Sequence, residues 1–95
     1  MLNVSSNLPG ADLVEQGLAD LKEGRTSDFS LLLQVAGPRL RRLGLEIPDR
    51  PSPRPYHHLL YERLEDRLGD DAYSHYNSLI RRIVSYTRAL EQQLA

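Results

Sequence analysis

The residues best suited to chemistry are three histidines and the carboxylates that lie one helical turn from two of them. His58 and Glu62 are four residues apart, as are Asp71 and His75. On a helix this spacing places both side chains on one face, where an imidazole and a carboxylate can ligate a metal ion or exchange a proton. The same spacing is common in surface pairs and helix caps, and a metal site would require the two pairs to converge. We therefore predict no metal site.

Other motifs of catalysis are missing from the sequence. The chain has no cysteine, so it has no thiolate nucleophile, disulfide or thiolate metal site. It has neither the Gly-x-Ser-x-Gly turn of serine hydrolases nor the Gly-x-x-x-x-Gly-Lys loop that binds phosphates. The five tyrosines lie at helical spacings that core or interface packing explains more simply. We predict a non-catalytic protein that binds no cofactor.

The arginines support a different hypothesis, which is nucleic-acid binding. The helical run 31–36, a Gly-Pro break and a short basic segment loosely resemble a helix-turn-helix, whose second helix enters the major groove. The contacting residues would be arginines of that segment and of the last helix: Arg39, Arg41, Arg42, Arg81 and Arg82. Against this hypothesis, the second helix is short and the chain is nearly neutral, with 12 basic and 13 acidic residues. The alternative is an arginine face that is solvated or holds the acidic face of the first helix.

Helical periodicity runs through most of the chain, and the elements that position these residues can be read from it. Residues 9–23 form an amphipathic pattern, in which Gly17 predicts the close approach of another helix. The segment 29–36 is apolar nearly all round, as in a buried helix, and we place the centre of the core there. Gly37 and Pro38 are expected to end it and to open a short helix over 39–43. Two further helices are expected, one over 56–68 and one from Asp70 or Asp71 to the C-terminal end.

Residues 48–55 separate two helical halves. This run holds four of the six prolines of the chain and favours extended, semi-rigid geometry. We interpret it as a connector, although such a run can also be a ligand for an aromatic groove. The prediction is an all-α, small single-domain bundle of about five helical segments with a long C-terminal helix. Its single domain, 1–95, comprises N-terminal helices (1–47), the Pro-rich connector (48–55) and a C-terminal helical hairpin (56–95).

The last helix carries the strongest pattern, a seam of residues spaced alternately by three and four positions. The seam consists of Tyr73, Tyr76, Ile80, Ile83, Thr87, Leu90 and Leu94. It either packs on the rest of the chain or binds a second copy or a helix of another protein, and tyrosine is enriched at such interfaces. The residues predicted for contact are Tyr73, Tyr76, Ile80, Ile83, Tyr86 and Leu90, with Arg81 and Arg82 as a polar rim.

The function expected from the sequence is therefore a protein–protein interaction or regulatory subunit, with a protein partner or a second copy bound through the C-terminal helix. Nucleic-acid binding through the arginines is the alternative. No apolar stretch reaches the length that spans a bilayer, and the N-terminal residues lack the pattern of a signal peptide. We expect a cytoplasmic protein that does not bind membranes.

Overall fold

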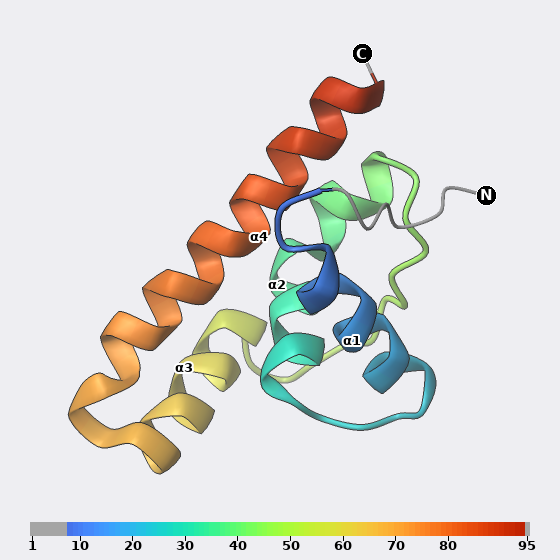
Figure 1. The fold of residues 1–95 in the computed structure, drawn as a ribbon. Helices are drawn as coiled ribbons and strands as arrows, with labels where there is room; N and C mark the ends of the chain where they lie inside the picture. The colour runs from blue at the N-terminus through green and yellow to red at the C-terminus, as the bar shows by residue number, and fades with distance from the viewer. Residues whose placement is uncertain (1–7, 95) are drawn as a thin grey trace.

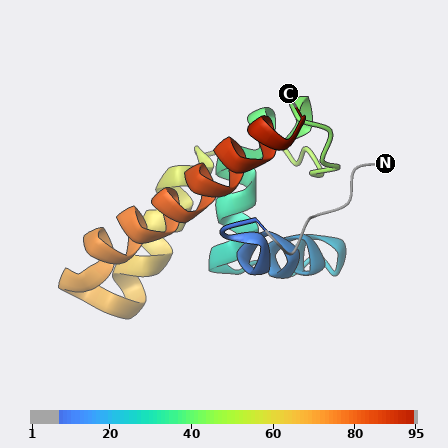
Figure 2. The same ribbon diagram turned by 45° about the horizontal axis from the view of Figure 1, so that its top comes forward.

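The computed structural model describes residues 8–94, and within them all regular structure is helical. The elements are α1 (Ala11–Lys22), α2 (Asp28–Arg42), α3 (Tyr56–Leu68), the short 3-10 helix η1 (Gly69–Asp71) and α4 (Ala72–Leu94). Helix α2 lies between α1 on one side and the antiparallel hairpin of α3 and α4 on the other (Figures 1 and 2). The all-helical class and the long C-terminal helix are as predicted. The N-terminal residues on which the signal-peptide prediction rests lie outside the described range.

The predicted count of about five helical segments is wrong, because α2 continues through Pro38 to Arg42. A proline inside a helix costs about 3 kcal/mol, because it lacks the N–H donor and its ring crowds the preceding turn. The buried residues Leu33, Gly37 and Leu40 are spaced by four and three positions, so one strip of α2 is buried on both sides of the proline. The ring of Pro38 itself is exposed. Packing along this strip outweighs the local cost and keeps the helix continuous.

The close approach predicted at Gly17 is confirmed. A Cβ atom placed on Gly17 would lie 2.7 Å from Cδ1 of Leu33 and 2.9 Å from the carbonyl oxygen of Phe29. Both distances are shorter than van der Waals contact allows, so only glycine lets α1 lie this close to α2. The glycine costs about 1 kcal/mol of helix propensity relative to alanine, and tight packing against the centre of the core offsets it.

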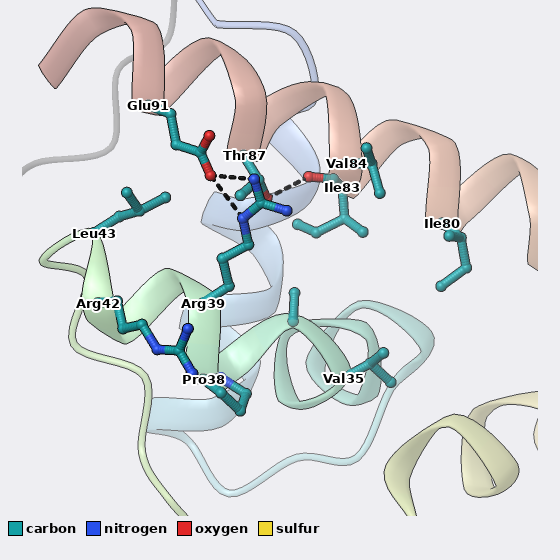
Figure 3. A pocket seen from close by; sticks show the side chains of 11 residues that line it. Val35, Pro38, Arg39, Arg42, Leu43, Ile80, Ile83, Val84, Thr87 and Glu91 are labelled. Atoms are coloured by element: carbon teal, nitrogen blue, oxygen red, sulfur yellow. Dashed lines mark hydrogen bonds and ion pairs between the residues drawn. The ribbon is translucent and has the colours of Figure 1, made fainter. Parts of the chain in front are cut away.

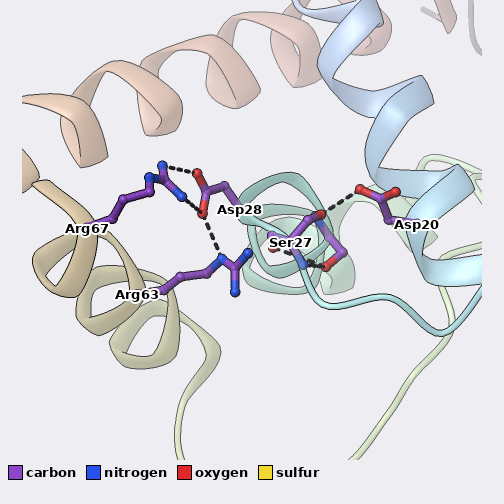
Figure 4. A network of polar contacts seen from close by, with 6 residues as sticks. Asp20, Ser27, Asp28, Arg63 and Arg67 are labelled. Atoms are coloured by element: carbon purple, nitrogen blue, oxygen red, sulfur yellow. Dashed lines mark hydrogen bonds and ion pairs between the residues drawn. The ribbon is translucent and has the colours of Figure 1, made fainter.

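Ser27 connects the end of α1 to the start of α2 (Figure 4). Its hydroxyl oxygen accepts a hydrogen bond from the backbone N–H of Ser30 at 3.1 Å, and the Ser30 hydroxyl accepts one from the backbone N–H of Ser27 at 2.8 Å. This reciprocal cap satisfies two free donors of the first turn. The Ser27 hydroxyl also donates to a carboxylate oxygen of the buried Asp20 at 2.6 Å. That bond lowers the pKa of the Asp20 carboxyl despite its burial, and Gln16 contributes a second bond in the same direction.

Asp28, in the first turn of α2, holds α3 in place (Figure 4). Arg63 donates to its carboxylate at 2.9 Å, and Arg67 donates to both carboxylate oxygens, at 2.5 and 3.3 Å. Burial alone raises the pKa of this carboxyl, and the two guanidinium groups more than reverse that effect, so the net pKa lies below its ordinary value. A carboxylate at this position also interacts favourably with the positive end of the helix dipole.

The buried apolar residues of both halves of the chain form one cluster. The predicted centre of the core is confirmed in that Leu31, Leu32 and Leu33 are all buried. After α2, the chain adds Leu45 and Ile47 to the cluster before it reaches the prolines. Helix α4 contributes a buried strip of its own, which runs from Ala72 to Leu90. At about 1.5 Å per residue this helix extends along most of the longest dimension of the molecule, which is 39 Å.

Replacing Gly17 by alanine tests the contact between α1 and α2. An alanine at an open helical position would stabilise the chain by about 1 kcal/mol. Here the added methyl group has to displace Leu33 and the backbone at Phe29, so we expect Gly17→Ala to lower the free energy of unfolding by about 1–3 kcal/mol in urea denaturation. Ala19→Gly, at an exposed position of the same helix, should cost only about 1 kcal/mol. A Gly17→Ala chain more stable than its parent would contradict the close approach.

Candidate interaction surface

The seam of α4 divides into a buried part and a part that stays accessible. Ile83, Tyr86 and Leu90 have exposed fractions of 3%, 0% and 1%, because they pack against the rest of the chain. These three residues, predicted for contact with a partner, are thus used in the core. Ile80 is only partly buried and Tyr73 is 66% exposed. The accessible surface of α4 therefore lies at the start of the predicted seam and along its two flanks.

One of these flanks forms a groove with the C-terminal half of α2. The groove has a volume of about 610 Å³, and its walls come from the two helices alone. Its apolar lining residues are Val35, Ala36, Pro38 and Leu43 from α2 and the end of that helix, and Ile80, Ile83 and Val84 from α4. Except for Ile83, these apolar side chains are at least partly exposed. We call this feature the α2–α4 groove (Figure 3).

An ion pair crosses one end of the α2–α4 groove. Arg39 extends from α2 to Glu91 on α4, 52 positions later in the chain, and two of its nitrogens donate to the same carboxylate oxygen (Figure 3). The Nε to Oε1 distance is 2.7 Å. About half of the Arg39 side chain and more than a third of that of Glu91 remain exposed. A pair this exposed contributes about 0–1 kcal/mol to stability, so the structure does not depend on it.

The five arginines predicted for nucleic-acid contact do not lie on one face. Arg41 turns back onto the chain that follows α2, where its Nε donates to the carbonyl oxygen of Ile47 at 2.7 Å and its Nη2 to that of Pro48 at 3.2 Å. Arg82 pairs with Asp12 of α1 at 3.1 Å. Neighbouring residues of a helix point about 100° apart, and Arg81 accordingly lies on a different side of α4.

Four arginines form no ion pair within residues 8–94, and three of them lie around the α2–α4 groove, whereas the fourth, Arg50, donates to the carbonyl oxygen of Leu21. Arg42 lines the groove. Arg81 lies three positions before Val84 and Arg88 four positions after it, so the three residues share one strip of α4. All three arginines are exposed, and no acidic residue within the described part of the chain pairs with them. The groove thus has an apolar floor and arginines on both rims.

The α3–α4 hairpin carries a second concave surface, of about 590 Å³, away from this groove. Tyr61 and Tyr76 meet edge to face there, with ring centroids 5.5 Å apart, and the exposed Tyr73 stands beside them. Of the residues predicted for contact, Tyr73 and Tyr76 therefore belong to the hairpin surface, whereas Ile80 belongs to the groove. The predicted interface is distributed over two separate surfaces.

The hairpin surface also includes two histidines and the carboxylate predicted as a partner of one of them. His57, His58 and Glu62 line it, and the two imidazole rings lie edge to face, 4.3 Å apart. Glu62 forms an ion pair with Arg54, whose hydrogen bond lowers the pKa of this carboxyl. A general base at neutral pH needs a pKa near 7, so this shift runs against such a role. Among residues 8–94, no three acidic or histidine residues are grouped closely enough to hold a metal ion.

Tyr86 is the buried polar side chain that lacks a partner within residues 8–94. Its hydroxyl group is fully buried without a hydrogen bond in that range. Burial raises the pKa of the phenol, and the charge of Glu15 adds to this effect. A phenol with a raised pKa carries even less of the reactive phenolate form at neutral pH, which favours a packing role for Tyr86.

Comparison with known proteins adds no relationship to this picture. No protein-family model, curated protein or solved structure matches the chain. Between residues 8 and 94, none of the helices combines the length and the apolar character that crossing a membrane requires.

Sequence reasoning missed the α2 wall of the groove and Arg88 on its α4 rim. The apolar pattern of 29–36 predicts a wholly buried helix, so it does not reveal that Val35 and Ala36 are only partly buried. The signal that points to them is the excess of apolar residues around α2, which three neighbouring helices do not fully cover. Arg88 and Glu91 drew no attention because their relation to α2 depends on how α4 crosses it.

The boundary between core and groove can be tested with two neighbouring residues. Ile83→Asp places a charge in the core without a partner, and we expect it to lower the free energy of unfolding by at least about 3 kcal/mol, enough to unfold much of the chain. Val84→Asp places the same charge at the partly exposed groove wall and should cost about 1 kcal/mol or less. Circular dichroism during thermal denaturation measures both. Equal loss of stability in the two variants would show that α4 is oriented differently.

Proposed function

We propose that this chain is a non-catalytic protein–protein interaction or regulatory subunit, which binds a helix of another protein in the α2–α4 groove. The observation that carries the proposal is the row of partly exposed apolar side chains between two helices, bordered by arginines. Exposed apolar surface rimmed by polar residues marks interaction sites. A groove between two helices accepts the apolar face of a third helix, with anchors spaced by three or four residues.

A second copy of the chain suits this groove less well than a different protein does. Two copies that associate through the same surface are related by a two-fold axis, which brings each patch against itself. The arginines on the rims, Arg42, Arg81 and Arg88, would then approach their own counterparts. Like charges at an interface disfavour association. The groove itself thus favours a partner with a different surface.

Nucleic-acid binding through the arginine-rich face has less support. Of the five arginines in that hypothesis, Arg39, Arg41 and Arg82 already bind groups of their own chain. The remaining arginines are separated by apolar side chains, which make no favourable contact with phosphate groups. The affinity of a protein for a phosphate backbone comes from positive charge. The hairpin surface with its tyrosines is a further candidate for contact with a partner. Unlike the α2–α4 groove, it lies between two consecutive helices and has no floor of apolar side chains from helices that are distant in sequence.

Photo-crosslinking in the native host tests the proposal at the level of single residues. The photoreactive residue benzoylphenylalanine replaces Val84 in one tagged chain and Ala19, which is exposed on α1 and does not line the groove, in a control. We expect one discrete crosslinked protein from position 84, unaffected by nuclease, and none from position 19.

The other outcomes of this experiment overturn parts of the proposal. A crosslink to a second copy would replace the foreign partner by self-association. Crosslinked nucleic acid would establish the arginine-rich face as the functional one. Equal crosslinking from both positions, or none from position 84, would show that the α2–α4 groove is not the binding surface.

A further inference from the structure

The charges around the α2–α4 groove indicate what kind of helix it receives. We infer that the partner segment is an amphipathic helix whose apolar face is flanked by carboxylates, and that Glu91 occupies the position of one such carboxylate in the free chain. This inference rests on the proposed function and specifies the partner of the same site.

Positive charge is concentrated around the α2–α4 groove. Arg39 and Arg42 line the groove on the α2 side, and Arg81 and Arg88 flank Val84 on the α4 side. Glu91 is the one acidic residue among those that line the groove. The whole chain has a formal charge of -1, so this local excess of arginine is a property of the groove and not of the overall composition.

The contact between Arg39 and Glu91 shows how a carboxylate binds at the end of the groove, because two guanidinium nitrogens already donate to one carboxylate oxygen there. Charge-assisted bonds of this type are the usual way in which arginine recognises carboxylates. Both side chains are substantially exposed, so a carboxylate of a partner can replace Glu91 on Arg39 without disturbing the core.

The spacing of the arginines on α4 also suits a helix. Arg81 and Arg88 are seven residues apart, which is two helical turns or about 10.5 Å along α4. A partner helix that lies along α4 can match them with two carboxylates that are also about two turns apart. Its anchors would follow the apolar spacing of three, four and seven residues that suits a groove between helices.

Selection from a displayed library of random peptides tests this inference with a defined probe. Peptides of about 16 residues, roughly 24 Å long as a helix, are selected on the immobilised full chain. Parallel selections use the Val84→Asp chain and, as a control with the same added charge away from the groove, the Ala19→Asp chain, which is altered at an exposed position of α1. We expect enriched peptides that combine helically spaced apolar residues with flanking Asp or Glu, on the parent and Ala19→Asp chains but not on the Val84→Asp chain.

Fluorescence anisotropy with the strongest peptide then assigns the charges. We expect Arg42→Glu and Arg81→Glu each to weaken binding by about tenfold, and Arg82→Glu, next in sequence but on another side of α4, to change it by less than about twofold. Glu91→Gln frees Arg39 and should tighten binding by about three- to tenfold. Thermal denaturation confirms that each variant is folded.

The possible failures are distinguishable from one another. Enriched peptides that depend on Val84 but carry no acidic residues would overturn the acidic partner and leave the groove as a docking site. Enrichment that ignores Val84→Asp, or no enrichment, would overturn both the inference and the proposed function. Acidic peptides whose binding Glu91→Gln does not tighten would contradict the role of Glu91.

Discussion

Residues 29–36 of helix α2 are apolar around almost the whole circumference of the helix, and the rest of the chain has to cover them from several sides at once. An isolated helix of this kind exposes too much apolar surface to water, and burial of such surface is the main favourable term in folding. Helix α1 covers one side at the distance that Gly17 allows. Helix α3 is fixed beside the first turn by Asp28, and α4 crosses the remaining side.

The proposed docking site lies where the other helices stop covering α2. Near the start of α2, Leu31 and Leu32 are buried, whereas Val35 and Ala36 in the following turns are only partly buried. Most arginines elsewhere are held by carboxylates or carbonyl oxygens of the same chain, and these contacts fix α1, α3 and the connector around α2. The arginines at the edge of the incomplete cover have few such contacts. Apolar surface and unpaired positive charge therefore occur together at the α2–α4 groove. The proposed docking site exists because the other helices leave this part of α2 uncovered.

Helical periodicity and single residues of the sequence predicted the helical class, the long last helix and the close approach at Gly17, because each depends on local spacing or on a single side chain. The break at Pro38 was predicted wrongly, since the local cost of proline is smaller than the packing of Leu33 and Leu40 on either side of it. For the candidate site, the sequence indicated α4 but not which of its flanks stays open. That depends on the angle at which α4 crosses α2, which no local pattern records.

Thiol reactivity of single cysteines tests most directly whether α2 is left open at the groove, and the absence of native cysteine makes each introduced thiol unambiguous. Cysteine is placed in turn at Val35 and Val84, which line the groove, and at Leu32 and Leu33, which are buried. We expect rapid modification at the two groove positions under native conditions, and modification at the two buried positions only as fast as the chain unfolds. Equal protection of Val84→Cys and Leu33→Cys would mean that α2 is covered on every side, and the groove would no longer explain the function of this chain.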